Sequence, residues 1–165
     1  KHSQASEALA EMFAASPPTG VEIIMKGGVG AITNAIQAGH AAFAAGGCAL
    51  LHMFAASEVT SRRIKADEDV VSGRCPAVLL GAMRLHFSNT AVQQWGAMTL
   101  WALCKDNPRC KAAMLQARDA DVLLDALSSY GKQSETLAKA LLGVMLTLAT
   151  NSGDWQEVLA EGGAP

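Results

Sequence analysis

The chain has 165 residues, of which 50% are hydrophobic, 17% charged and 5% aromatic, and its formal net charge is −2. This composition supplies enough apolar material for a continuous core and carries too little charge for a disordered chain. Binding to nucleic acid or to anionic membranes over a broad surface needs a strongly basic protein, so neither function is expected here.

The first part of the chain is predicted to be helical, with breaks at Pro and Gly. Residues 1–16 are predicted to be the last helix of one unit, and residues 17–57 a first complete unit. Thr19 and Glu22 have the spacing of a capping box, so the first helix of this unit is expected to start at Thr19 as its N-cap. The third helix of the unit is nearly all apolar and is expected to end at Ala56.

A second unit is predicted over residues 58–106. Its opening section, Ser57–Arg74, is long, and the sequence leaves open whether this section is a loop or a functional insertion. Thr90 and Gln93 form another capping box, which predicts the start of the third helix of this unit.

A third unit is predicted over residues 107–151, and residues 152–165 are expected to open a further one. Asn107 is a favourable N-cap, and Pro108 fits the first helical position, where its missing N–H costs nothing. Gly131 is expected to end the second helix. The third helix carries apolar residues at helical spacing, namely Leu137, Leu141, Val144, Met145 and Leu148.

These units repeat one another. The segment Met12–Ser16 returns letter for letter as Met53–Ser57. Looser copies end at Asp106 and Asn151, so the spacings are about 41, 49 and 45 residues. Helical units that recur every 40 to 47 residues or so are typical of armadillo and HEAT solenoids. We therefore expect an all-α solenoid of about three complete units with partial units at both ends, in which residues 1–165 are one internal piece of a longer protein.

Two kinds of motif resemble the armadillo repeat family. Leu159–Pro165 and Ile24–Val29 are similar to the end of the family's first helix and the turn that follows it, and Val92–Cys104 is similar to its third helix. The resemblance covers nearly the whole chain and implies a right-handed superhelix with a concave groove lined by third helices. The HEAT family has a similar architecture and stays open as an alternative, although the Gly-Gly turn before the second helix favours armadillo.

The resemblance also indicates what the groove lacks. In the importin-alpha branch of the family, Trp and Asn one turn apart on the third helix hold an extended peptide. Here the Trp position is Trp101 but the Asn position is Lys105, which is similar to beta-catenin-like grooves that use basic side chains for acidic ligands. Recognition of nuclear import signals is therefore not expected. The matching positions of the other units hold neither residue type, being His52 with Ala56 and Leu146 with Thr150.

Five side chains are candidates for partner binding. Trp101 and Lys105 lie four residues apart and so share one helix face, where Trp101 would offer an apolar platform and Lys105 a charge for a partner carboxylate. The alternative is that Trp101 packs against the neighbouring unit and Lys105 is merely solvated. Gln94 and Met98 continue the same stripe. His52 occupies the matching slot one unit earlier and is expected either to face the groove or to be half-buried.

No motif for catalysis or for binding a metal or cofactor occurs. The four cysteines form no C-x-x-C pair, and Cys48 and Cys104 fall in apolar helical patterns, which predicts buried free thiols. The acidic run Asp67–Asp69 lacks the spacing of a calcium loop, and Gly27–Gly30 lacks the Lys-Ser/Thr of a phosphate loop. We therefore expect no enzyme, no metal site and no cofactor.

The leading hypothesis is a non-catalytic scaffold that binds a partner protein or peptide along the third-helix groove. Two alternatives are a structural subunit of a large assembly of axonemal, organellar or chaperone type, and an interaction module of a larger enzyme such as a ubiquitin ligase. The apolar stretch Ala41–Ala56 is too short to span a bilayer, so no membrane insertion is expected. The expected location is intracellular and cytoplasmic, with an organelle or the axoneme as alternatives.

Overall fold

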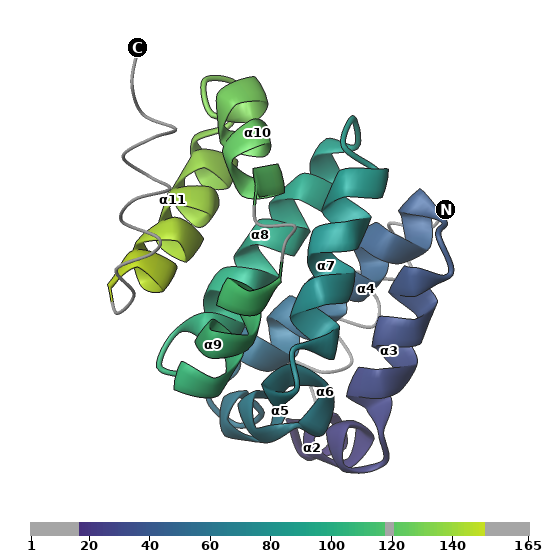
Figure 1. Cartoon of the computed structure of the whole chain (residues 1–165). Helices are drawn as coiled ribbons and strands as arrows, with labels where there is room; N and C mark the ends of the chain where they lie inside the picture. Colours follow the sequence, from purple (N-terminus) through teal and green to yellow (C-terminus); the bar gives the residue numbers. More distant parts are fainter. Residues whose placement is uncertain (1–16, 118–120, 151–165) are drawn as a thin grey trace.

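The computed structural model describes residues 17–117 and 121–150 (Figure 1). Every regular element in these two ranges is a helix, which confirms the expected all-α class there. The helices expected in residues 1–16 and 152–165 lie outside the described residues. The ten helices are α2 (Pro17–Met25), α3 (Gly28–Gln37), α4 (Ala41–Ala56), α5 (Ser61–Ala66), α6 (Glu68–Val71), α7 (Arg74–Leu85), α8 (Thr90–Cys104), α9 (Pro108–Gln116), α10 (Asp121–Tyr130) and α11 (Glu135–Ala149).

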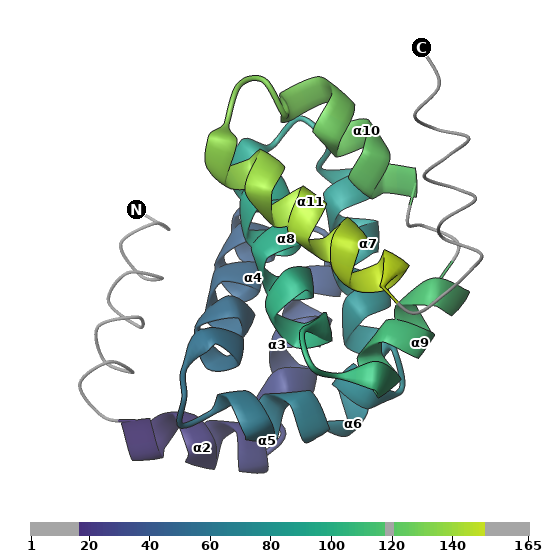
Figure 2. The ribbon, with the colours of Figure 1, turned by 90° about the vertical axis from the view of Figure 1, so that its left-hand side faces the viewer.

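The helices are arranged in layers. Figure 2 shows α4 beside α8, with α11 crossing in front of α8 and with α3 and α7 farther from the viewer. Contacts between helices agree with this view, because α8 packs on both α4 and α11, while α7 packs on α3 and α10. We call α4, α8 and α11 the third-helix layer and α3, α7 and α10 the second-helix layer. The shorter helices follow the same rule, since α2 contacts α5 and α6 contacts α9.

The core lies between these layers. Leu51 of α4, Leu100 of α8 and Val144 of α11 are all fully buried, and each belongs to the inward face of a helix in the third-helix layer. Removing such a side chain from water contributes about 1.5–3 kcal/mol, so burial of these faces is the main force that holds neighbouring helices together. The apolar spacing that predicts each helix thus also determines which face it buries.

Several predicted helix ends are confirmed. The side chain of Asn107 accepts a hydrogen bond from the Cys110 N–H at 3.2 Å, and Pro108 is the first residue of α9. Gly131 follows the last residue of α10. Gly27 precedes α3 with a φ of 82°, a left-handed conformation that glycine adopts without steric cost.

Both predicted capping boxes are wrong. Helix α2 begins at Pro17, so Thr19 lies inside it. Asn89 caps α8 in place of Thr90. Its side-chain oxygen accepts hydrogen bonds from the N–H groups of Ala91 and Val92, at 3.1 and 3.2 Å. Gln93 does not reach back to the cap. Its buried side chain instead donates to the backbone oxygen of Met83 in α7, at 2.7 Å.

The long opening section of the second unit is helical. It forms α5 and α6, which are separated at Asp67. The carboxylate of Asp67 accepts a hydrogen bond from the Asp69 N–H at 3.0 Å and so starts α6. These two short helices contact α2 on one side and α9 on the other, and the section is therefore built into the stack of helices.

Candidate functional site

Exposed apolar side chains gather on the third-helix layer. Among the described residues, seven large hydrophobic side chains are exposed, and three of them, Met25, Val59 and Leu85, lie outside this layer. The other four belong to its helices, which together make up a minority of the described chain. They are Phe43 on α4, Trp101 on α8, and Leu142 and Leu146 on α11.

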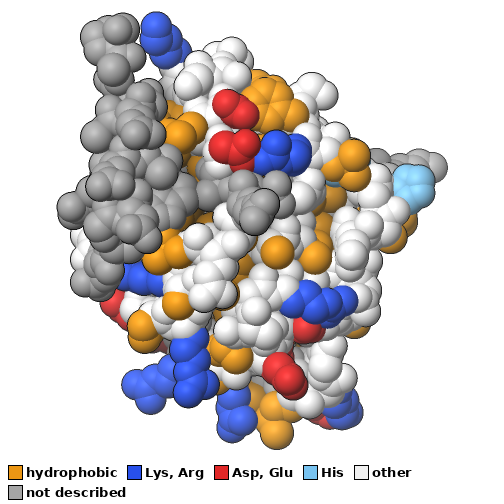
Figure 3. Space-filling view, in the orientation of Figure 1, with side chains coloured by type: hydrophobic (Ala, Val, Ile, Leu, Met, Phe, Trp, Pro, Cys, Tyr) orange, Lys and Arg blue, Asp and Glu red, His pale blue; other side chains and the backbone are white. Residues whose placement is uncertain are grey.

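The same helices carry almost no charge. No Asp, Glu, Lys or Arg occurs in α4 or α8, and α11 has only Glu135 and Lys139. Charged residues are 17% of the whole chain, and Figure 3 shows basic and acidic side chains spread among apolar ones over the face of the molecule that contains α7. A helix face that meets only water is normally polar or charged. The uncharged outward faces of α4 and α8 are therefore unusual for a solvated surface.

Trp101 is fixed in place by a glycine of the neighbouring helix. A Cβ atom added to Gly143 of α11 would lie 2.5 Å from Cε2 and 2.7 Å from Cδ2 of Trp101, so the indole ring lies directly against the backbone of α11. The side chain is still 37% exposed. Trp101 thus packs against its neighbour, as one of the two alternatives held, and also presents part of its ring to the outside.

Two leucines flank this contact. Leu142 precedes Gly143 in the chain, and Leu146 follows it by three residues, about one helical turn. They are 53% and 66% exposed. We call Trp101, Leu142 and Leu146 the Trp101 patch. It joins α8 to α11 on the outward surface of the third-helix layer.

The other candidates on α8 differ from one another. Lys105 follows the last residue of α8 and is exposed, so its ammonium group lies at the end of the helix that carries Trp101. Gln94 is half-buried, and Met98 is half-buried and packs against the hydrophobic core. Of the side chains in the predicted stripe, Trp101 and Lys105 at the C-terminal end of α8 are therefore more exposed than Gln94 and Met98.

His52 lies at the contact between α4 and α8. Its ring is 5.7 Å from the ring of Trp95, measured between centroids, and its Nδ1 atom is buried without a hydrogen-bond partner. Burial lowers the pKa of His52, and a backbone hydrogen bond with Met98 partly opposes that effect. The imidazole is therefore held neutral and half-buried, which is the second of the two alternatives for this residue.

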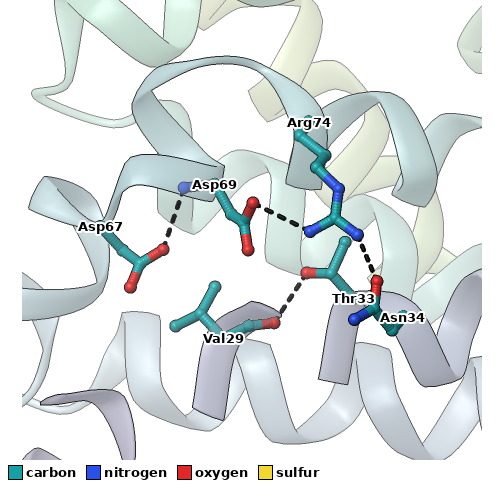
Figure 4. Close-up of polar contacts among 6 residues, drawn as sticks. All are labelled: Val29, Thr33, Asn34, Asp67, Asp69 and Arg74. Atoms are coloured by element: carbon teal, nitrogen blue, oxygen red, sulfur yellow. Dashed lines mark hydrogen bonds and ion pairs between the residues drawn. The ribbon is translucent and has the colours of Figure 1, made fainter. Parts of the chain in front are cut away.

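The acidic run near residue 67 has a structural use (Figure 4). Arg74 donates a hydrogen bond to Asp69 at 2.9 Å and another to the side-chain oxygen of Asn34, and this arginine thereby connects α6 and α7 to α3. Asp67 is occupied as the cap of α6. The close approach also depends on Gly30, because a Cβ atom there would lie 2.7 Å from Oδ2 of Asp69. The carboxylate of Asp69 thus joins α6 to α7 and, through Arg74, to α3, while the carboxylate of Asp67 caps α6.

The cysteines lie in the core of the helical stack. All four are free and buried, as predicted for Cys48 and Cys104. Burial raises the pKa of Cys48 and of Cys75 to about 12, so both thiols are protonated at neutral pH, whereas a reactive cysteine is a thiolate. Over residues 17–117 and 121–150, no group of three or more His, Cys, Asp or Glu side chains is placed to hold a metal ion.

Two shallow hollows open on the second-helix layer. One of about 330 Å³ lies between α3 and α7, where Ile36, Gly81 and Leu85 line it. The other, of about 360 Å³, lies between α7 and α10 beside Arg84, Phe87 and Asp125. These volumes are at the low end for ligand pockets, and neither hollow is lined by a His or a Cys. In the part of the chain that the structure describes, no helix is both long and apolar enough to cross a bilayer.

Sequence reasoning proposed Trp101 and Lys105 as binding residues but did not propose Leu142 or Leu146, which flank the contact between Trp101 and Gly143. Leu142 and Leu146 lie four residues apart, on a different face of α11 from its buried apolar residues. The helical spacing in the sequence could therefore have identified them as exposed apolar side chains. Phe43 could not have been found in this way, because α4 is apolar along nearly its whole length and its sequence does not separate a buried face from an exposed one. The seating of Trp101 on Gly143 has no such signal, because it depends on how two distant helices pack.

Comparison of the chain with protein-family models, with curated proteins and with solved structures finds no match.

Proposed function

We propose that this chain is a non-catalytic protein-interaction scaffold, built as a right-handed solenoid of armadillo-type units. Two observations support the architecture. Short, intermediate and long helices recur three times in the same order, and helices of the same rank in successive units contact each other. Stacked helical units of this kind present extended surfaces to partners. Four buried free thiols fit a reducing, intracellular location.

The observation that carries the binding proposal is the Trp101 patch on the outward surface of the third-helix layer. Helices α4 and α8 of this layer contain no charged residue, while α11 exposes Glu135 and Lys139 on the same face as the two leucines of the patch. Interfaces are depleted of charge at their centres and enriched in aromatic side chains. Trp101 has the properties of an anchor, since Gly143 holds its ring in place and part of the ring is open to a partner. Lys105, at the end of α8, gives the patch a charged edge.

The chemistry of this surface favours a helical partner over an extended one. An extended peptide buried on it would need hydrogen-bond partners for its own N–H and C=O groups. In a peptide-binding ladder the amide follows the Trp position by one helical turn. The residues at these amide positions are here Ala56, Lys105 and Thr150, and none of them is Asn or Gln. An amphipathic helix satisfies its backbone internally and can place apolar residues on the Trp101 patch.

The test compares two leucines of equal exposure on different layers. Leu146 on α11 is 66% exposed and Leu85 on α7 is 68% exposed, so Leu146→Ser and Leu85→Ser change the surface equally but at different sites. Partners are captured from native extract with the wild-type protein and both variants, identified by quantitative mass spectrometry, and then retested as purified segments. We expect Leu146→Ser to weaken binding of the retested segment by tenfold or more and Leu85→Ser to leave it unchanged.

Circular dichroism of the retested segment provides a second measurement, because a helical partner should gain helix on binding. Equal binding by wild type and Leu146→Ser would remove the third-helix layer from consideration. Loss of binding with Leu85→Ser alone would move the site to the second-helix layer. Fold is checked by comparing the far-ultraviolet spectra of all three proteins.

A permanent structural role in a large assembly is the second candidate, because permanent interfaces are the more apolar ones. The two roles differ in whether the bound partner exchanges with free partner in solution. A scaffold exchanges its partner when labelled free protein is added to the native complex, whereas a structural subunit stays at a large, salt-resistant mass. A separate catalytic domain in the same protein would make the chain an interaction module of an enzyme, and full-length sequencing of the transcript decides that.

A further inference from the structure

Three sulfur atoms meet where α8 ends and α9 begins. The Sγ atoms of Cys104 and Cys110 are 3.3 Å apart, and the Sγ of Cys104 is 3.1 Å from the Sδ of Met114. Cys104 is the last residue of α8, while Cys110 and Met114 lie four residues apart on α9 and so face the same way. All three residues are completely buried.

The turn that brings these helices together is held by side-chain hydrogen bonds. Asn107 accepts from the Cys110 N–H at 3.2 Å, and its amide nitrogen donates to the backbone oxygen of Lys65 in α5 at 3.0 Å. Asp106, next to it in the turn, has a φ of 57°. Cys104, Cys110 and Met114 are thus placed by a fixed cap that is also tied to the preceding unit.

Two thiols and one thioether form a soft ligand set. Soft sulfur ligands select Cu(I), whereas carboxylate and carbonyl oxygens suit Mg²⁺ and Ca²⁺. A structural zinc site takes four ligands, and among the residues that the structure describes no His or carboxylate joins these two cysteines to help complete such a set. We propose that Cys104, Cys110 and Met114 form a buried binding site for a single Cu(I) ion. This inference does not depend on the proposed scaffold function.

The binding step is balanced by release of protons. One Cu⁺ replaces the protons of two thiols, which leaves a complex of two thiolates and one thioether with a net charge of −1 and sends two protons to solvent. The hydrogen bond with Cys104 and burial raise the pKa of the Cys110 thiol, and the nearby ammonium group of Lys65 opposes only part of that rise. No oxidant or reductant takes part.

The site requires only a small expansion. Metal–thiolate bonds of about 2.3 Å in a trigonal arrangement place the sulfur atoms about 4 Å apart, so each observed distance has to grow by less than about 1 Å. Met114 has three flexible side-chain bonds, which makes the thioether the easiest ligand to move. Because Cys104 and Cys110 lie on different helices, the ion would also tie α8 to α9 and stabilise the folded state.

The experiment titrates the reduced 165-residue chain with Cu(I) held by a colorimetric chelator, without oxygen. We expect one copper per chain, a Tm rise of several degrees at saturation, and an X-ray absorption spectrum with only sulfur neighbours. Cys104→Ser and Cys110→Ser should each lose at least a hundredfold in affinity. Met114→Leu keeps the core volume and should lose about tenfold. Cys48→Ala removes a buried free thiol outside the cluster and should bind as the wild type does.

Three results would overturn the proposal. One is the absence of copper binding by the folded wild-type chain, and another is equal binding by the wild type, Cys104→Ser and Met114→Leu. The third is a Cys104–Cys110 disulfide that survives treatment of the protein with a reductant, as mapped by alkylation and mass spectrometry. Far-ultraviolet circular dichroism identifies any variant that fails to fold, and Met114→Leu then carries the test.

Discussion

At the scale of single residues, His52 combines partial burial with a ring nitrogen that has no hydrogen-bond partner. Its ring is enclosed between α4 and α8 beside Trp95, and its Nδ1 atom has no partner. Burial lowers its pKa from the ordinary value of 6.5. The folded state therefore resists protonation more than the unfolded chain does.

We predict that His52 makes stability depend on pH near neutrality. Its contribution is fully present above pH 6.5 and is lost as the pH falls through the lower, folded-state pKa. Urea unfolding of the wild type and His52→Gln at pH 7.5 and pH 5.5 measures this, and the wild type should lose more stability than the variant between the two values. A pH dependence that is identical in the two proteins would show that His52 titrates normally. Asp67, whose pKa burial raises, is present in both and cancels in the comparison.

Two helical glycines should respond in opposite ways to alanine. Gly143 lies under the ring of Trp101, so a methyl group there displaces the ring, and Gly143→Ala should lower the free energy of unfolding by about 1 kcal/mol. Gly81 in α7 has open space around its Cβ position, so Gly81→Ala should raise it by about 0.5–1 kcal/mol through helix propensity. Chemical denaturation of both variants is the measurement. If Gly143→Ala stabilises as much as Gly81→Ala, Trp101 does not lie against α11.

At the scale of helices, the start of α8 shows how two acceptable caps compete. Asn89 and Thr90 are neighbours, and both residue types are good N-caps. Asn89 caps the helix because Gln93 is buried and hydrogen-bonded to Met83, so the capping box with Thr90 is not formed. A local rule is overridden here by burial against α7.

Alanine substitution at each of the two positions tests this assignment. Asn89→Ala should lower the free energy of unfolding by about 1 kcal/mol, because two N–H groups of α8 lose their acceptor. Thr90→Ala, at an exposed position, should stay within about 0.5 kcal/mol of the wild type. Thermal and urea unfolding are compared for the two variants, and a larger loss for Thr90→Ala would assign the cap to Thr90.

At the scale of the whole molecule, each helix depends on its neighbours for burial. The most extensive helix contacts join α8 to α4 and to α11, so α8 is covered on both sides within the third-helix layer. The main contacts of helix α2 are with α3 and α5, near its own end of the described chain. Stability in stacked helical proteins is approximately a sum over such neighbouring contacts.

We predict a gradient of amide hydrogen exchange along the stack. Protection should be highest in the middle of α8 and should fall toward α2 and α10, because opening α8 breaks two extensive contacts at once. Exchange measured by mass spectrometry on overlapping peptides gives protection helix by helix, and we expect a difference of about tenfold or more between α8 and α2. Uniform protection in all helices would mean that the chain opens only as a single unit.

The helical class, the end of α4 at Ala56, the cap at Asn107 and the burial of Cys48 and Cys104 could all be predicted from the sequence. These follow from periodicity and from contacts within a few residues, which a linear pattern records directly. Only the tertiary structure decided that Trp101 lies on Gly143, that His52 is enclosed beside Trp95, and that Cys104 meets Cys110 and Met114. Those contacts depend on the offset and rotation of one helix against another, which many distant side chains determine together through packing.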